Sequence, residues 1–441
     1  MPLPRPGKPP LHRRAAAPVA IVAAALTLAG CGSSGGSHTA TPTTSATPAA
    51  TSASPVPTGG SPTSLPPTNA PDSSSTSTSP STSTSPSSSP SATSGPPSVG
   101  PVTSSGQASS GTGLRKPLPV TRAVHITGAA WAYKPKHDAV MALLKAHRIN
   151  AIEVDIKDET GTVNYASQVP LATTVGAVDK LYGVKQMLAE IHAAGGRVIG
   201  REVVFNDPKL AKWAWLNGHK DDVLQTTAHQ PWQGSYGAYA FTNFANAQVQ
   251  QYNIDLAVEA AKDGFDDVLY DYVRRPDGKL SQMYIPGLTG TPEQGVASFV
   301  ANTRKAFTQA GVSTFLGASV FGIAATRPKE IAQDITLMAP YLDYVAPMVY
   351  PSHWGSDEYG LHSPVTQPYQ IVQRSLKDFT AKVKGTGATV VPWLQAFSLG
   401  GVKYGTTQVL AQEKGAHADG LDGFLLWNAG ANYDAADLPK F

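Results

Sequence analysis

The feature that most constrains the fold of this chain is a regular alternation of short β-branched runs with longer amphipathic stretches after residue 119. The short runs predict eight strands, at Ala123–Ala129, Ala151–Lys157, Arg197–Phe205, Asp267–Arg274, Thr314–Phe321, Tyr344–Tyr350, Thr389–Phe397 and Gly423–Asn428. The stretches between them predict helices, at His137–His147, Gly183–Ala194, Ala245–Lys262, Pro292–Ala310, Pro328–Ala339, Pro368–Val383 and Thr406–His417. This alternation is typical of an α/β (β/α)8 TIM barrel, here over 119–441. An open doubly wound sheet is the alternative, but no glycine-rich phosphate loop follows the first strand.

The first 31 residues have the pattern of a bacterial lipoprotein signal peptide. Basic residues precede an apolar stretch, Ala15–Leu28, which is shorter than a comfortable membrane span. The stretch leads into Leu28-Ala29-Gly30-Cys31, which resembles the lipobox whose cysteine thiol takes a diacylglyceryl group. An ordinary signal peptide with a chance cysteine is the alternative. We therefore expect a protein anchored through Cys31 to the outer face of the bacterial cell membrane, in an extracytoplasmic location.

Residues 32–118 predict a disordered linker, because they are mostly Ser, Thr, Pro, Gly and Ala. Four of the 34 Lys and Arg residues precede residue 32, and one of the 31 Asp and Glu residues lies between residues 32 and 113, so the chain after residue 113 has 30 of each and is formally neutral. A neutral domain argues against nucleic-acid binding. The single cysteine excludes a disulfide within the chain.

Charged side chains alternate with apolar ones in the second predicted strand, at Glu153, Asp155 and Lys157. Because one face of a barrel strand packs on helices, we expect these three to point into the barrel. Burying an unpaired charge is costly, so the charges must pair or face a solvated site. An internal ion network that only stabilises the barrel is the alternative.

Asp271 lies late in the fourth predicted strand, close to the rim where barrel active sites assemble. Arg274 or Arg275 could keep this carboxylate ionised, as a nucleophile or a transition-state stabiliser requires. A purely structural pair of Asp271 with an arginine is the alternative. Aromatic and polar residues at other strand ends resemble the make-up of carbohydrate sites. With Arg274, the predicted substrate-binding residues are Trp131, Lys157, Arg201, Glu202, Tyr350, His353, Trp393, Gln395, Trp427 and Asn428.

The chain from about residue 124 to 428 resembles a bacterial family of TIM barrels named "putative glycosyl hydrolase", whose members are largely uncharacterised. The motifs that carry the resemblance are Val154-Asp155-Ile156-Lys157-Asp158, Tyr270-Asp271-Tyr272-Val273-Arg274, Pro347-Met348-Val349-Tyr350-Pro351-Ser352-His353, Pro392-Trp393-Leu394-Gln395-Ala396-Phe397 and Leu426-Trp427-Asn428. The resemblance implies a glycosidase-like barrel, with neither a substrate nor catalytic residues assigned.

Two better-known groups of barrel enzymes are similar only in part. In the chitinase-type motif, alternating acids on the fourth strand end in a proton-donating Glu, where this chain has Val273. The alpha-amylase superfamily also uses a fourth-strand Asp, but its fifth-strand Glu has no counterpart in Leu316–Phe321. Substrate-assisted hydrolysis of the chitinase type is therefore not expected.

Glycoside hydrolysis normally needs two carboxyl groups, one ionised and one protonated. We expect Asp271 to be the nucleophile or base and Asp155 or Asp158 to be the acid, with Glu202 as a third candidate. The predicted function is hydrolysis of a cell-wall or extracellular polysaccharide by a monomer without a cofactor. A non-catalytic glycan-binding lipoprotein is the main alternative. Metal-dependent deacetylation is disfavoured, because His125, His353 and His362 show no clean ligand spacing.

Overall fold

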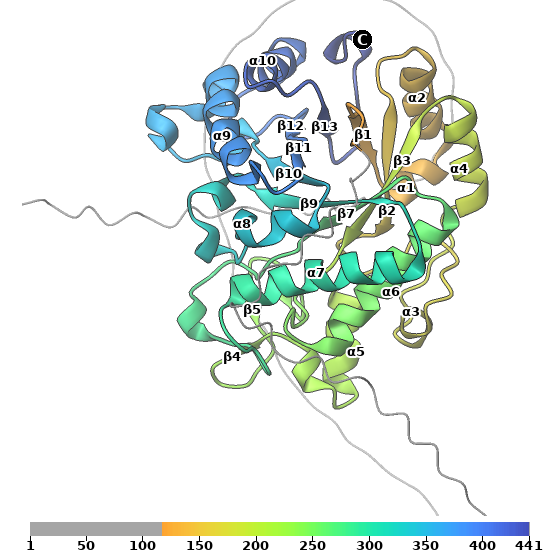
Figure 1. Cartoon of the computed structure of the whole chain (residues 1–441), viewed down its shortest axis with the longest axis vertical. Helices are drawn as coiled ribbons and strands as arrows, with labels where there is room; N and C mark the ends of the chain where they lie inside the picture. Colours follow the sequence, from red (N-terminus) through yellow and green to blue (C-terminus); the bar gives the residue numbers. More distant parts are fainter. Residues whose placement is uncertain (1–116, 441) are drawn as a thin grey trace, which may run out of the picture. The chain divides into compact units, whose positions relative to one another are not determined.

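The computed structural model describes residues 117–440, and the predicted leader with Cys31 and the linker through residue 116 lie outside this part (Figure 1). The barrel strands, in pairing order, are β1 (Arg122–Ile126), β2 (Ala151–Lys157), β3 (Arg197–Val203), β7 (Asp267–Asp271), β9 (Phe315–Phe321), β10 (Tyr344–Met348), β12 (Trp393–Gln395) and β13 (Phe424–Trp427). All neighbours are parallel, and β13 pairs with β1. This ring closes a (β/α)8 TIM barrel.

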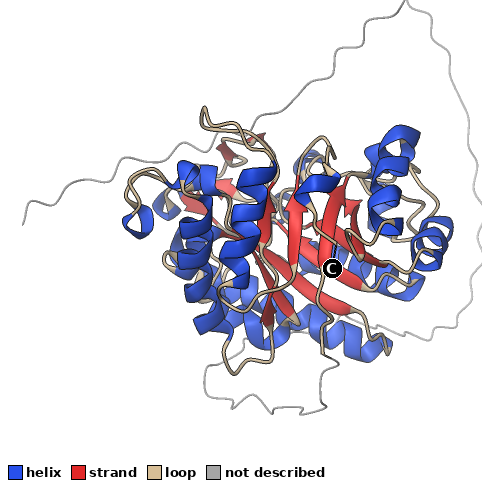
Figure 2. Cartoon of the chain, turned by 90° about the horizontal axis from the view of Figure 1, so that it is seen from above, coloured by secondary structure: helices blue, strands red, loops and turns tan. Residues whose placement is uncertain are grey.

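Helices surround the strands on the outside of the barrel (Figure 2). They are α1 (Gly128–Ala132), α2 (Lys134–Lys145), α3 (Pro170–Thr174), α4 (Val184–Ala193), α5 (Pro208–Leu216), α6 (Ala247–Asp263), α7 (Pro292–Ala310), α8 (Ile335–Met338), α9 (Pro368–Val383) and α10 (Thr406–His417). No helix within residues 117–440 is both long and apolar enough to cross a membrane.

The ends of α7 show how local sequence sets a helix. The Thr291 side chain accepts a hydrogen bond from the Gln294 amide, and the Gln294 side chain returns one to the Thr291 amide. Pro292 occupies the first turn, where its missing N–H costs nothing, and Gly311 ends the helix at φ 67°. The predicted bounds of α7 are therefore confirmed.

All eight predicted strands are present, but two predicted elements are divided. The seventh strand forms as β11 (Thr389–Val390) and β12, separated around Pro392, which has no N–H to donate to a ladder. The prediction of one helix over Pro328–Ala339 is wrong. Ala332 has φ 59° there, in the left-handed region, so only a short 3-10 turn and α8 form.

Apolar side chains form two layers around the strands. The layer inside the barrel includes Ala123, Ile199, Leu269, Tyr344 and Trp393. A larger cluster lies between the strands and the helices. The longest insertion, residues 204–246, follows β3 and carries α5 with the short strands β4 (Gln225–Thr226), β5 (Gln233–Gly234) and β6 (Gly237–Ala238). β4 pairs with β8 (Met283–Tyr284), and β5 pairs with β6.

Candidate active site

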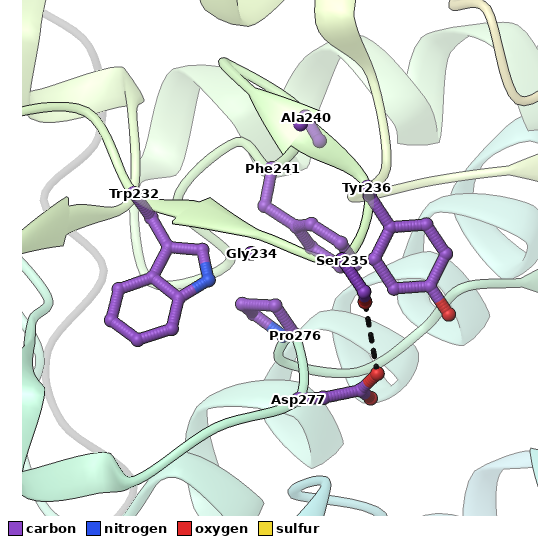
Figure 3. Close-up of a pocket in the computed structure, with 9 residues that line it drawn as sticks. Trp232, Gly234, Ser235, Tyr236, Ala240, Phe241, Pro276 and Asp277 are labelled. Carbon is purple, nitrogen blue, oxygen red and sulfur yellow. Dashed lines mark hydrogen bonds between the residues drawn. The ribbon is translucent and has the colours of Figure 1, made fainter. Parts of the chain in front are cut away.

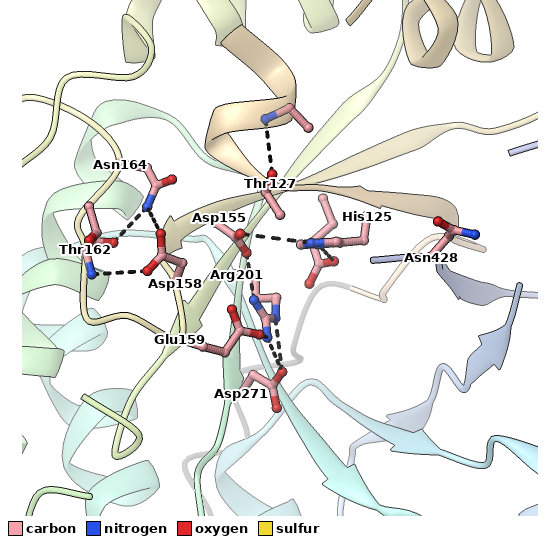
Figure 4. A network of polar contacts seen from close by, with 12 residues as sticks. His125, Thr127, Asp155, Asp158, Glu159, Thr162, Asn164, Arg201, Asp271 and Asn428 are labelled. Carbon is pink, nitrogen blue, oxygen red and sulfur yellow. Dashed lines mark hydrogen bonds and ion pairs between the residues drawn. The ribbon is translucent and has the colours of Figure 1, made fainter. Parts of the chain in front are cut away.

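A cluster of charged side chains surrounds Arg201 at the carboxyl ends of β2, β3 and β7 (Figure 4). Arg201 Nη1 donates to Asp155 Oδ1 at 2.8 Å. Its Nε and Nη2 donate to Asp271 Oδ2 at 3.0 and 2.7 Å. Nη2 also donates to the Glu159 carboxylate, which lies in the loop after β2. One guanidinium therefore binds three carboxyl groups, an arrangement that suits the planar fork of arginine.

The strand register explains why these residues meet. Asp155 lies beside Arg201 across the β2–β3 pair, and Arg201 lies beside Leu269 across the β3–β7 pair. Asp271 is two residues beyond Leu269 and therefore shares its inward face. The structure thus brings Asp155 and Asp271 together on Arg201. The prediction that Arg274 or Arg275 pairs with Asp271 is wrong.

Below Arg201, His125 links a second buried acid to the cluster. His125 Nδ1 lies 2.9 Å from Glu153 Oε2, and His125 Nε2 lies 4.0 Å from Asp155 Oδ2. The imidazole stacks on Trp427 with ring centroids 4.2 Å apart, and the Arg201 guanidinium lies 5.0 Å from the same indole. His125 Nε2, Glu153 Oε1 and Asp155 Oδ2 have no hydrogen-bond partner.

Burial determines the protonation of these groups. It raises the pKa of Asp155 to about 7, against the opposing effects of His125 and Arg201. Burial also lowers the pKa of His125 to about 4 and raises that of Glu153 well above its usual value. In contrast, Arg201 outweighs partial burial at Glu159 and lowers the pKa of that carboxyl. Near neutral pH the cluster therefore combines an acid that still holds a proton in part of the molecules, Asp155, with an ionised one, Glu159.

Access to the cluster is uneven. The Asp155 side chain is fully buried, and that of Arg201 is 1 % exposed. The Asp271 side chain is 9 % exposed, whereas that of Glu159 is 39 % exposed. Solvent therefore reaches the cluster from the side of Glu159 and Asp271.

The match to known families covers this cluster and nearly the whole barrel. Residues 123–433 match the family described as "Putative glycosyl hydrolase domain". The chain belongs to this family. As a member of the glycosyl hydrolase family, it is a glycosidase-type barrel. The search of curated proteins finds no match to the chain.

Solved structures similar to this chain include several glycoside hydrolases. The endo-1,4-beta-D-mannanase of Thermotoga petrophila RKU-1 is 11% identical with a TM-score of 0.47, over 70% of this chain and 88% of that chain. The catalytic domain of beta-amylase from Paenibacillus polymyxa is 11% identical with a TM-score of 0.47, over 73% and 96%. A hypothetical protein from Ruminiclostridium thermocellum is 26% identical with a TM-score of 0.40, over 44% and 96%.

Lys157 and Glu202 lie on the opposite side of the sheet from Arg201. The register shifts between Asp155 and Lys157, so that Lys157 pairs with Glu202. Lys157 Nζ donates to Asp207 Oδ2 at 2.8 Å and to Asn253 Oδ1, on α6, at 2.6 Å. The prediction that Lys157 points into the barrel with Asp155 is therefore wrong, because a bulge adds one residue to β2. Glu202 follows Arg201 directly and so faces outward with Lys157.

Asp158 is separate from the Arg201 cluster. Its Oδ1 accepts hydrogen bonds from the Thr160 amide and hydroxyl and from the Thr162 amide. Its Oδ2 accepts from Asn164 Nδ2 at 3.2 Å. Asp158 thus stabilises the loop that carries Glu159.

Arg274 is surrounded by aromatic rings and does not pair with Asp271. Its guanidinium lies between 4.3 and 5.5 Å from four rings, those of Tyr236, Phe241, Tyr272 and Phe321. Arg274 Nη2 donates to the Tyr236 hydroxyl at 2.8 Å, and Nη1 lies 3.3 Å from Asp277 Oδ1. Figure 3 shows the adjoining residues, which pack too closely to leave room for a water molecule and among which Ser235 Oγ donates to Asp277 Oδ2 at 3.4 Å. Arg274 therefore ties the β5–β6 hairpin to the end of β7.

The remaining predicted binding residues divide between the rim and the core. Trp427 is half-buried beside Arg201, while Trp393 is buried and donates to Ser319 Oγ at 3.0 Å. Gln395 is buried, accepts from the Ser352 amide and donates to the Phe397 carbonyl. Trp393 and Gln395 therefore stabilise the barrel and its rim loops.

Tyr350, His353 and Phe397 form an aromatic cluster after β10 and β12, with ring centroids 5.2 to 5.9 Å apart. Asn428 donates to the Ala396 carbonyl and accepts from the Gly430 amide. Trp131 lies in α1 and lines a different cavity. Within residues 117–440, no group of three or more His, Cys, Asp or Glu side chains could hold a metal ion.

Glu159 is the residue of the cluster that sequence reasoning missed. It follows Asp158 directly after β2 and is the most exposed carboxyl bound to Arg201. The only available signal was its place just beyond a strand's carboxyl end, where barrel active sites assemble. Because Asp158 shares that position, the pattern does not say which acid turns inward.

Proposed function

We propose that this chain is a membrane-anchored, extracytoplasmic glycoside hydrolase that acts on a cell-wall or extracellular polysaccharide. The supporting observation is that two carboxyl groups from different strands, Asp155 and Asp271, share the guanidinium of Arg201 at the carboxyl end of the barrel. Two carboxyls in different protonation states are what glycoside hydrolysis requires.

In this proposal Asp271 is the nucleophile or general base. Its Oδ2 accepts two hydrogen bonds from Arg201, and its Oδ1 accepts one from the Tyr272 amide at 2.7 Å. Asp155 is the general acid, since burial raises its pKa to about 7 and a substantial fraction of the molecules therefore holds the proton near neutral pH. Its proton passes to the glycosidic oxygen as the bond to the anomeric carbon breaks, while Asp271 attacks that carbon or takes a proton from the attacking water.

Access sets a requirement on this mechanism. Asp155 is buried, and Glu159 lies on the solvent side of the same guanidinium. The contact between Arg201 and Glu159 must therefore open before a sugar can reach Asp155. Substitution of Glu159 by Gln, which weakens this contact, is expected to change the rate of hydrolysis without abolishing it.

The decisive experiment compares the wild type with Asp271→Asn on isolated wall and capsular glycans. We expect the wild type to release reducing ends and the variant to lose at least about 1,000-fold in rate, because neither nucleophilic nor base catalysis remains. An equal rate in the two proteins would remove Asp271 from the mechanism.

The anchoring part of the proposal rests on the leader sequence that ends at Cys31. Metabolic labelling with a radioactive fatty acid, followed by membrane fractionation, tests it. The wild type is expected to be labelled and membrane-bound, and Cys31→Ser is expected to be unlabelled.

A non-catalytic, glycan-binding lipoprotein is the second candidate. The full burial of Asp155 and the 9 % exposure of the Asp271 side chain favour it, because an ion-paired interior is also what a purely structural network looks like. This candidate predicts oligosaccharide binding without turnover. Binding would then be abolished by Trp427→Ala but unaffected by Asp271→Asn.

A further inference from the structure

A groove on the outer side of the barrel rim lies apart from the Arg201 cluster, and we infer that it binds a neutral oligosaccharide. The groove has a volume of about 370 Å³, within the range of pockets that bind small ligands. The lining residues on which the argument rests are Trp131, His137, Tyr182, Gln186, Met187 and Glu190. None of these six side chains forms a hydrogen bond or an ion pair with the side chain of Arg201, Asp155 or Asp271.

The position of the groove links it to the strands of the candidate active site. Trp131 lies in α1, which follows β1 after a single residue, and Tyr182 lies just before α4. The Tyr182 hydroxyl donates to the backbone carbonyl of Asp155 at 2.8 Å. The groove wall is therefore attached to β2 at the same height as Asp155, on the side away from the barrel axis.

The lining combines apolar walls with a hydrogen-bonding rim. Trp131 and Tyr182 are 7% and 8% exposed and Met187 is 1% exposed, so the apolar wall that reaches the groove consists mainly of the edges of the two rings. His137 Nε2 lies 3.1 Å from Glu190 Oε2 on the rim, and the Gln186 side chain is exposed there. The Gln186 amide offers both donors and an acceptor to hydroxyl groups, and the Asp138 and Glu190 carboxylates that hold the two His137 ring nitrogens offer further acceptors.

The charges around the groove favour a neutral ligand over an anion. Lys134 is bound by Asp138, and His137 is placed between Asp138 and Glu190. The rim thus presents one lysine beside two carboxylates, which disfavours an anion, and a sugar with uncharged hydroxyl groups fits both its apolar and its polar parts.

The identity of the ligand as a polysaccharide segment rests on the proposed function. If the Arg201 cluster cleaves a polysaccharide, a second segment held in this groove keeps the chain near the cluster and raises its effective concentration there. Binding in the groove itself requires no catalysis, so the two proposals can be tested separately.

The experiment uses the full chain with Asp271→Asn, so that no turnover interferes. Cellohexaose, maltohexaose and chitohexaose are each titrated alone at millimolar concentrations, and the Trp131 indole N–H signal is followed by two-dimensional NMR, with Trp131→Phe to assign it. At least one of the three is expected to shift this signal. Adding Gln186→Ala or His137→Ala should weaken that sugar's binding by about tenfold, which corresponds to about 1.4 kcal/mol.

Gln251→Ala is the matched control, because Gln251 is exposed on α6 and bonds only within that helix, to Asp255. It should leave the affinity unchanged. The proposal is overturned if none of the three sugars shifts the Trp131 signal, or if Gln186→Ala and His137→Ala both bind like the control. Hydrolysis by the protein without the Asp271 substitution is measured in parallel. Its absence would count against the proposed function and not against the groove.

Discussion

Strands β2 and β3 carry two buried ionic networks, one on each face, and they differ in their access to solvent. The inner network joins His125, Glu153, Asp155, Arg201 and Asp271, and reaches solvent through Glu159 and Asp271. The outer network joins Lys157, Asp207 and Asn253 beside Glu202, and it is sealed under α6.

Burial of charge alone therefore does not identify a functional site. Lys157 and Asp207 are as buried as Arg201, with side chains 0% and 1% exposed, yet no rim opens beside them. Lys157 also lies 4.8 Å from the Tyr252 ring on α6. The outer network therefore suits a structural role, and the inner one has the open edge that chemistry requires.

The sharpest test of this contrast is Arg201→Met. Removing the guanidinium leaves Asp155, Glu159 and Asp271 without their shared cation, so we expect a loss of about 4 kcal/mol in the free energy of unfolding. Urea denaturation measures it. Arg201→Lys keeps the charge without the planar fork and should recover part of the loss. A loss below about 1 kcal/mol would show that the inner network is not held together by Arg201.

The corresponding change on the outer face is Lys157→Met. We expect a loss of about 3 kcal/mol in unfolding free energy, because Asp207 would remain buried without its cation. Hydrolysis per folded molecule should not change. The double variant Lys157→Met with Asp207→Asn is expected to regain stability, since no unpaired charge remains. Loss of hydrolysis with normal stability would place Lys157 in the active site and break the contrast.

A pH series separates the proton held by Asp155 from the rest of the protein. The pKa of Asp155 is raised from 3.8 to about 7 by burial, so the folded state keeps a proton that the unfolded state releases. Wild-type stability should therefore fall relative to Asp155→Asn as pH rises from about 4 to about 7, by about 4 kcal/mol in total. Below about pH 4 the difference in stability between the two proteins should no longer change with pH, because residue 155 of the wild type is then protonated in both the folded and the unfolded state.

The opposite shift at His125 makes the difference measurement necessary. The pKa of His125 is lowered from 6.5 to about 4, so the wild type gains stability over nearly the same pH range. The two effects oppose each other in the wild type, and only the comparison with Asp155→Asn isolates the carboxyl. A constant difference between the two proteins across this range would contradict a protonated Asp155.

The smallest effect is expected for Glu202→Gln on the outer face. Neither carboxyl oxygen of Glu202 has a hydrogen-bond partner, and burial raises its pKa well above its usual value. Burial therefore favours the neutral form of the group, and an amide of the same shape should change the unfolding free energy by less than about 1 kcal/mol. A loss above about 2 kcal/mol would indicate that Glu202 is ionised and pairs with Lys157.

Much of the fold could be predicted because the barrel depends on a local pattern. The run Ala151–Lys157 forms a strand with the predicted bounds. The helices α7, α9 and α10 also begin and end at the predicted residues. The failures have local causes that the pattern does not show. Ala332 adopts a left-handed conformation inside a stretch with helical spacing, and the short helices α1, α3 and α5 are set by packing around the loops.

The candidate site was predictable only in part. Asp155 and Asp271 lie near the ends of their strands, and parallel strands bring those ends to one rim. Trp131 also follows a strand end, but α1 turns it into a separate groove. The sequence does not distinguish Glu159 from its neighbour Asp158. In the structure Glu159 binds Arg201, whereas the Asp158 side chain accepts hydrogen bonds from its own loop.

The sequence by itself determined the barrel and the presence of acids at its rim, because the period of apolar residues decides between strand and helix along the chain. Only the tertiary structure decided which charges meet. A one-residue bulge in β2 moves Lys157 to the outer face and leaves Arg201 as the partner of Asp155 and Asp271. The physical reason is that side-chain direction in a strand reverses with every residue, so a single extra residue exchanges the two faces without changing the hydrophobic pattern.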